Sequence, residues 1–95
     1  MHVVIRRYRN AAQLMDTLEQ RRADVEQLIR GVPGFVAYYL VRSGDGGASI
    51  SVYQDAAGTA ESTRLAAEWI RQNAPQAAGT PPEVTEGTAV IQFGP

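Results

Sequence analysis

The tetrapeptide GDGG and its flanks constrain the fold more strongly than any other feature of the chain. The segment FVAYYLVRSGDGGASISVYQ alternates along two arms on either side of GDGG. An Asp-Gly pair between two such arms is typical of a β-hairpin closed by a two-residue type I′ turn. We therefore predict strands over residues 35–43 and 48–54, with Asp45 and Gly46 in the turn.

This turn also sets a register and sorts the side chains into two faces, because successive side chains of a strand point to opposite sides of the sheet. The register pairs Val41 with Ile50, Tyr39 with Val52 and Tyr38 with Tyr53. The face expected to pack against helices carries Phe35, Ala37, Tyr39, Val41, Ile50 and Val52. The opposite face carries Val36, Tyr38, Leu40, Tyr53 and, from the last strand, Val90.

Segments with helical or strand-like spacing surround the hairpin. Apolar residues recur at helical spacing over residues 10–31 and 56–74, and strand-like runs cover residues 2–9 and 84–93. Residues 76–83 are expected to form a linker. The resulting order is β-α-β-β-α-β.

This order predicts an α+β, ferredoxin-like domain over residues 1–95, with two helices on one face of a four-stranded antiparallel sheet. The second face of the sheet would then expose a large apolar patch, which is rare on a monomeric protein and typical of an interface. We expect an identical subunit to cover it, so that the protein is a homodimer.

Composition excludes several classes of function. The chain has no Cys, no Lys and one His, which rules out disulfides, Cys-ligated metals, a Schiff-base lysine and a His-containing triad. Nine Arg and ten acidic residues are spread along the chain, so we expect no nucleic-acid partner. No apolar run approaches the about 20 residues that a membrane span needs, and no leader pattern precedes the first strand. We expect a cytoplasmic protein without a membrane partner.

Two short motifs carry a resemblance to a known family. Within VPGFVAYYLVRSGDGGASISVYQD, Pro33-Gly34-Phe35 is similar to the Pro-Gly-Phe that opens the family's second strand, and Tyr53-Gln54-Asp55 to the aromatic-x-Asp before its second helix. In order of elements, nearly the whole chain resembles the antibiotic-biosynthesis-monooxygenase-like members of the dimeric α/β-barrel superfamily. This resemblance implies a dimer whose sheets face each other in an eight-stranded barrel, and a place for a pocket between helices and sheet.

The chemistry of this superfamily is diverse and includes cofactor-free oxygenation of phenolic polycycles, haem degradation, lactone isomerisation and members with no known activity. Its haem-degrading members place a His on the second helix, and this sequence has none between Asp55 and Pro75. We therefore expect no cofactor and no metal. No catalytic residue can be carried over from the family.

Each candidate residue has a structural and a functional interpretation. Phe35, Tyr39 and Trp69 are the residues predicted to line a substrate pocket, if there is one; the simpler interpretation of Tyr39 and Trp69 is that they are core aromatics. Tyr38, Tyr53, Leu40 and Val36 are predicted to form the dimer interface, with Arg6, Arg42 and Tyr8 beside them. A buried Arg6 would need an acidic partner, for which Glu86 is the candidate. His2 is expected to have no chemical role.

Two functions remain open at this point. One is a cofactor-independent, monooxygenase-like enzyme that acts on a small aromatic or phenolic molecule. The other is a non-catalytic, dimeric protein that binds a small ligand or responds to stress. A regulatory or RNA-binding protein of the same topology is disfavoured, because the sequence lacks the corresponding glycine turn and aromatic signature.

Overall fold

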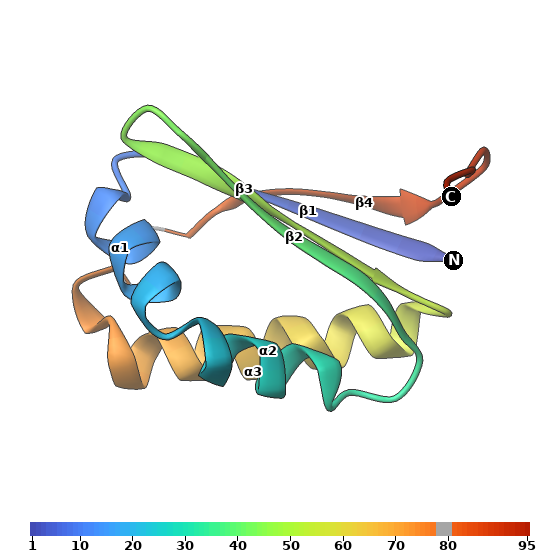
Figure 1. Ribbon diagram of the computed structural model, residues 1–95, viewed down its shortest axis with the longest axis horizontal. Helices are drawn as coiled ribbons and strands as arrows, with labels where there is room; N and C mark the ends of the chain where they lie inside the picture. The colour runs from blue at the N-terminus through green and yellow to red at the C-terminus, as the bar shows by residue number, and fades with distance from the viewer. Residues whose placement is uncertain (78–80) are drawn as a thin grey trace.

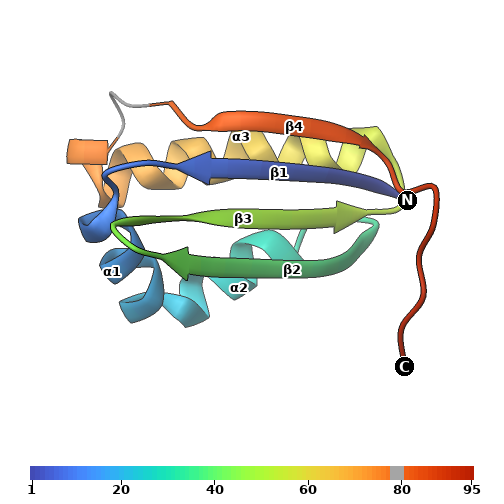
Figure 2. The same ribbon diagram turned by 90° about the horizontal axis from the view of Figure 1, so that it is seen from above.

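One face of a four-stranded antiparallel sheet is covered by helices in the computed structural model, which describes residues 1–77 and 81–95 (Figure 1). The strand order is β2-β3-β1-β4, so that β2 and β4 are the edges (Figure 2). The elements are β1 (His2–Tyr8), α1 (Ala12–Gln20), α2 (Arg22–Arg30), β2 (Phe35–Ser43), β3 (Gly46–Tyr53), α3 (Ala56–Asn73), η1 (Pro75–Ala77) and β4 (Glu83–Thr88). The ferredoxin-like α+β fold predicted from the sequence is confirmed. The predicted linker falls partly on residues 78–80, which lie outside the described residues.

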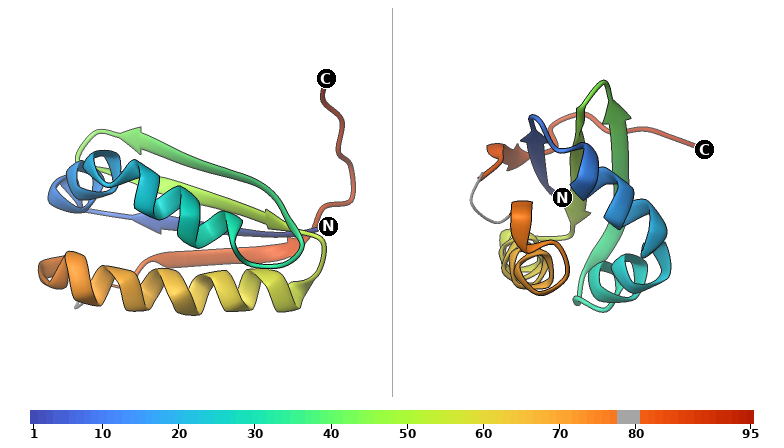
Figure 3. Two further views of the ribbon diagram at one scale, coloured as in Figure 1. Left: turned by 60° about the horizontal axis from the view of Figure 1, so that its bottom comes forward. Right: turned by 90° about the vertical axis from the view of Figure 1, so that its left-hand side faces the viewer.

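The helical layer has two parts. The predicted first helix is divided at Arg21, whose backbone leaves the helical region at φ −105° and ψ 31°. The Arg21 side chain is held by Asp24, at 2.7 Å from Nε to Oδ2, and by Asn73 of α3, at 3.2 Å from Nη1 to Oδ1. α3 contacts β1 and β3, whereas α2 contacts the edge strand β2 (Figure 3).

The hairpin forms as predicted, but the predicted register of its two strands is wrong by two residues. Ser43 pairs with Gly46, so the turn residues are Gly44 and Asp45. Gly44 has φ +59°, whereas Asp45 has no positive φ, which excludes the type I′ turn. Gly46 and Gly47 are used for close packing instead: a Cβ on Gly46 would lie 2.1 Å from the Tyr8 carbonyl oxygen, and one on Gly47 2.3 Å from that of Val41.

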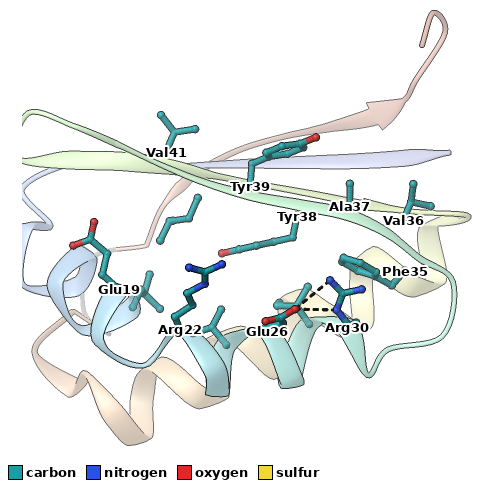
Figure 4. Close-up of a pocket in the computed structure, with 14 residues that line it drawn as sticks. Glu19, Arg22, Glu26, Arg30, Phe35, Val36, Ala37, Tyr38, Tyr39 and Val41 are labelled. Atoms are coloured by element: carbon teal, nitrogen blue, oxygen red, sulfur yellow. Dashed lines mark hydrogen bonds and ion pairs between the residues drawn. The ribbon is translucent and has the colours of Figure 1, made fainter. Parts of the chain in front are cut away.

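The shift changes the cross-strand partners and leaves the two faces separate, because it moves the pairing by an even number of residues. Tyr39 lies opposite Ile50, and Tyr38 lies opposite Ser51 instead of Tyr53. At the start of β2 a bulge lets Phe35 pair with Tyr53 and sends Val36 to the same side as Ala37 (Figure 4).

The prediction of which face meets the helices is wrong. Tyr39 is 60% exposed on the open face, whereas Tyr53 is fully buried on the helix side. The helix-facing side of the sheet contains Val4, Arg6, Tyr38, Leu40, Ser49, Ser51 and Tyr53, and the open side contains Val3, Ile5, Tyr39, Val41, Ile50 and Val52. The polar residues Arg6, Ser49 and Ser51 look like a solvated face in the sequence, but they are buried and bond to one another.

The core explains both motifs of the family resemblance. Tyr53 donates a hydrogen bond from its hydroxyl to the Ile29 carbonyl oxygen at 2.5 Å, which ties β3 to α2. Asp55 caps α3 by accepting a hydrogen bond from the Gly58 N–H at 3.1 Å. Gly34 has φ +87°, and its carbonyl accepts a hydrogen bond from the Gln54 N–H at 2.8 Å. The first motif therefore joins the two arms of the hairpin at its open end, and the second ties β3 to α2 and begins α3.

The last strand is shorter than predicted. β4 ends at Thr88, and residues 89–95 extend beyond the sheet and away from the helices (Figures 1 and 2). The side chains of Val90, Ile91 and Phe93 are 89%, 80% and 89% exposed. The sequence placed Val90 within the sheet, on the face opposite the helices. Val90 instead lies beyond the end of the sheet. In the described residues, no helix is long and apolar enough to cross a membrane.

Candidate functional site

A groove separates the edge strand β2 from α1 and α2, and we call it the edge groove (Figure 4). Its volume is about 820 Å³, within the range of small-molecule sites. Its uncharged lining comprises Leu18, Val25, Ile29 and all of residues 35–41 of β2, and its charged lining comprises Glu19, Arg22, Glu26 and Arg30. The groove runs along β2, an edge strand that has no further strand beside it in the described part of the chain.

Three of the four charged residues of the groove form ion pairs. Glu26 pairs with Arg30 at 3.1 Å, and the Arg30 guanidinium lies 5.1 Å from the centre of the Phe35 ring. Glu19 pairs with Arg42 at 3.0 Å. Arg22 forms no ion pair within the described residues, and Figure 4 shows it pointing into the groove, as Tyr38 does. The groove thus offers aromatic surface and one unpaired cation.

A second, smaller space lies deeper between the sheet and the helices, and we call it the inner cavity. Its volume of about 30 Å³ is that of one water molecule. Its polar lining is Arg6, Tyr8, Tyr38 and Ser49, and its apolar lining is Leu18, Val25, Leu28, Ile29, Ala66, Trp69 and Ile70. Four residues, Leu18, Val25, Ile29 and Tyr38, line both spaces. The inner cavity is therefore the inward neighbour of the edge groove.

Arg6 is the unusual member of this lining. It is 5% exposed, and its Nη1 donates to Ser51 Oγ at 3.2 Å and to Ser49 Oγ at 3.5 Å. Its Nη2 donates to the Thr63 hydroxyl of α3. Its Nε is buried and has no hydrogen-bond partner in the described part of the chain. The predicted acidic partner Glu86 is exposed on β4, so three neutral hydroxyls replace the expected ion pair.

The two tyrosines of the inner cavity are proton donors at neutral pH. Burial raises the pKa of Tyr38 to about 12; the nearby Tyr8 adds to this effect, while Arg6 and the Ser49 hydroxyl oppose it. Burial also raises the pKa of Tyr8, against the opposing effects of Arg6 and Ser49. The lining of the inner cavity contains no Asp, Glu or His in the described residues. It can therefore stabilise a negatively charged oxygen, and it contains no side chain suited to remove a proton at pH 7.

The structure separates the residues that the sequence assigned to a pocket. Trp69 lies in the helix–sheet layer as expected, and Phe35 lines the edge groove with its ring 5.8 Å from that of Tyr53. Tyr39 belongs to the strand that lines the edge groove, but its side chain points to the open face, away from Trp69 (Figure 4). A meeting of Tyr39 with Trp69 is therefore excluded, and the binding roles of Phe35 and Trp69 stay predictions.

The residues assigned to the dimer interface are also redistributed. Tyr38, Leu40 and Tyr53 face the helices, so their expected orientation is wrong, whereas Val36 is exposed on the open face. Arg42 pairs with Asp16 at 2.7 Å as well as with Glu19, at the surface near α1. His2 hydrogen-bonds through Nδ1 to Thr59 Oγ1 of α3 at 2.7 Å.

Sequence reasoning missed the polar cluster around Arg6. Part of this cluster has a signal in the alternation of the strands, because Arg6 lies on the same face of the sheet as Ser49 and Ser51. Thr63 lies 57 positions from Arg6, and no spacing rule connects the two.

The helix–sheet layer does not fit a haem group. α3 contains no His, Cys, Met or Tyr that could ligate iron. The enclosed space beside it has the volume of one water molecule. Within the described residues, no group of three His, Cys, Asp or Glu side chains could hold a metal ion.

Comparison with known proteins gives matches in structure and none in sequence. No protein-family model and no curated protein matches the sequence. A protein of unknown function from Nitrosomonas europaea superposes with a TM-score of 0.74 at 20% identity, covering 99% of this chain and 93% of that one. The haem degrader MhuD of Mycobacterium tuberculosis, solved with two haems in its active site, gives 0.70 at 19% identity, covering 99% and 100%.

A third solved structure concerns oxygenation directly. It is a monooxygenase from the ActVA-Orf6 gene of Streptomyces coelicolor in complex with the ligand Nanaomycin D, with a TM-score of 0.64 at 18% identity, covering 99% of this chain and 89% of that one. The resemblance found in the sequence is thus confirmed at the level of the fold: the chain has the ferredoxin-like fold of solved antibiotic-biosynthesis-type monooxygenases and haem degraders.

Proposed function

We propose that the protein is a homodimeric, cofactor-independent, monooxygenase-like enzyme that acts on a small aromatic or phenolic molecule. The observation that carries this proposal is the edge groove, whose aromatic lining leads inward to the cavity of Arg6 and Trp69. Proteins of the same fold include a monooxygenase solved with the ligand Nanaomycin D and a cofactor-independent oxygenase of Streptomyces nogalater. The groove is large enough for two or three fused rings.

Such a reaction needs no metal or flavin when the substrate supplies the electrons. A ring-bound CH₂ group next to an ionised phenol can reduce O₂: the carbon gains one oxygen atom as a carbonyl, and both hydrogens leave with the other oxygen atom as water. The residues of this chain would bind the rings, exclude water and stabilise the negative charge of the ionised substrate. Arg6, Tyr8 and Tyr38 are the groups available for the last task.

A second candidate function is ligand binding without turnover. It is favoured by the absence of a free base in the described lining, where Glu19 and Glu26 are ion-paired and Tyr8 and Tyr38 have raised pKa values. An enzyme of this composition would depend on substrates that are already ionised or that ionise readily. The two functions therefore differ in turnover and share the same binding site.

The test uses Trp69, the single Trp of the chain, as a reporter. Two- and three-ring phenols are expected to quench its fluorescence, and O₂ uptake with an oxygenated product identifies the enzyme. Binding without O₂ uptake would instead support the second candidate, and no binding by any phenol would contradict both.

A matched pair of variants locates the site. Val25→Phe places a larger side chain between the groove and the inner cavity and is expected to weaken binding at least tenfold. Val90→Phe makes the same change at an 89% exposed side chain beyond the end of β4 and is expected to leave binding unchanged. Equal effects of the two variants would place the ligand elsewhere.

A further inference from the structure

The guanidinium of Arg6 is buried, and none of the described residues places a negative charge against it. An uncompensated charge is expensive to bury, and native proteins normally pair such a group with a carboxylate. The described residues offer Arg6 only the hydroxyls of Ser49, Ser51 and Thr63. The charge itself is permanent, because the guanidinium group does not lose its proton in proteins.

The hydrogen bonds around Arg6 leave a surplus of donors. Of its three nitrogens, Nη1 and Nη2 reach hydroxyl oxygens, and Nε reaches none. Tyr8 and Tyr38 bring two further O–H donors to the same small space. A space rich in donors and holding one net positive charge is complementary to an oxygen-centred anion.

The volume of the inner cavity limits what can enter it. About 30 Å³ holds a single small polar group and no aromatic ring. The edge groove, with about 820 Å³, has room for the rest of a ligand, and Tyr38 lies on the boundary of both spaces. A ligand that occupies both spaces must therefore place its small charged end inward and its rings outward. The Tyr38 side chain, which lies between the two spaces, must move aside to let it pass.

We propose that Arg6 is the anchor for an anionic oxygen, from a carboxylate or an ionised phenol, of the aromatic ligand that lies in the edge groove. This role rests on the proposed function for the aromatic part of the ligand and adds its charge and orientation. The apolar walls of Leu28, Trp69 and Ile70 strengthen the interaction, because they keep water away from the ion pair. Arg22, which has no ion pair in the described chain, provides a second positive charge at the entrance.

Calorimetric titration of the wild-type protein with two probes of equal shape tests the anchor. 2-Naphthoate is expected to bind at least tenfold more tightly than the neutral 2-naphthamide. 4-Nitrophenol, titrated below and above its own pKa, distinguishes the phenol from the carboxylate: tighter binding of the ionised form assigns phenolate to the site as well. Equal binding of both forms restricts the site to carboxylates.

Two variants connect the preference to Arg6. Arg6→Gln is expected to abolish the preference for naphthoate while binding naphthamide as the wild type does, and Arg6→Lys is expected to restore part of it. Equal affinity of the two naphthalenes for the wild type, or an unchanged preference in Arg6→Gln, overturns the anchor and leaves an aromatic ligand standing. Failure of both naphthalenes to bind overturns the proposed aromatic ligand together with the anchor. If Arg6→Gln does not fold, the affinities of the wild type for naphthoate and naphthamide still test whether the site prefers an anion.

Discussion

Tyr38 and Tyr39 are neighbours in β2 with opposite environments. Tyr38 points into the helix–sheet layer beside Arg6, Tyr8 and Ser49, whereas Tyr39 points into solvent on the open face (Figure 4). Water stabilises a phenolate, so the buried phenol of Tyr38 resists ionisation more strongly than a phenol in the unfolded chain. The proton of Tyr38 is therefore linked to the folded state.

This linkage predicts a loss of stability at high pH. The folded pKa of Tyr38 is about 12, above the ordinary value of 10.0, so its contribution is complete below pH 10 and declines as the pH rises from 10 towards 12. Urea unfolding between pH 9 and pH 11.5 measures the decline. Tyr38→Phe is expected to reduce this decline. A pH profile of Tyr38→Phe identical to that of the wild type would contradict the assignment.

At the scale of elements, the hairpin depends on the two glycines that enter β3. Gly47 packs so closely that a Cβ would meet the Val41 carbonyl oxygen at 2.3 Å and Met15 Sδ at 3.0 Å. The sequence predicted both strands and the turn region correctly, because alternation and the Asp-Gly pair are local signals. It could not predict the register, because contacts with Tyr8 and Met15, far away in the chain, outweigh the preference of Asp-Gly for a type I′ turn.

Substitution of two glycines tests this packing. Gly47→Ala is expected to lower the free energy of unfolding by roughly 2 kcal/mol, in the range that overpacking costs. Gly87→Ala in β4 has nothing within 4 Å of its new Cβ and no positive φ, so it is expected to be neutral or slightly stabilising. Chemical denaturation compares the two, and equal stabilities would show that Gly47 is not tightly packed.

At the scale of the whole molecule, the more apolar face of the sheet is the one left open. Val3, Ile5, Tyr39, Val41, Ile50 and Val52 lie on it. The large apolar side chains of Val90, Ile91 and Phe93 lie beyond the end of the same sheet. Sequence reasoning recognised two faces and assumed that the more apolar one meets the helices. The assumption fails because the hydroxyls of Ser49, Ser51 and Thr63 allow a polar cluster to be buried. The existence of a helix–sheet layer with Trp69 was predictable, and the cluster around Arg6 was not.

The open face supports the proposed homodimer and gives it a test. Light scattering at micromolar concentration is expected to give twice 10.3 kDa for the wild type. Tyr39→Glu places a charge in the middle of the open face and is expected to shift the protein to monomers. Gln72→Glu adds the same charge on exposed α3 and is expected to leave the dimer intact. A monomeric wild type would contradict the dimer.

The unbalanced charge of Arg6 has a consequence for how long the protein persists in a cell. Without a ligand, the buried guanidinium lowers the free energy of unfolding, and unfolded chains are degraded. An anion at Arg6 binds only the folded state, and at a concentration of 100 times its dissociation constant it adds about 2.7 kcal/mol. The proposed anchor would thus make the lifetime of the protein depend on the concentration of its ligand. The amount of protein in the cell would then rise with the ligand concentration, without any change in gene expression.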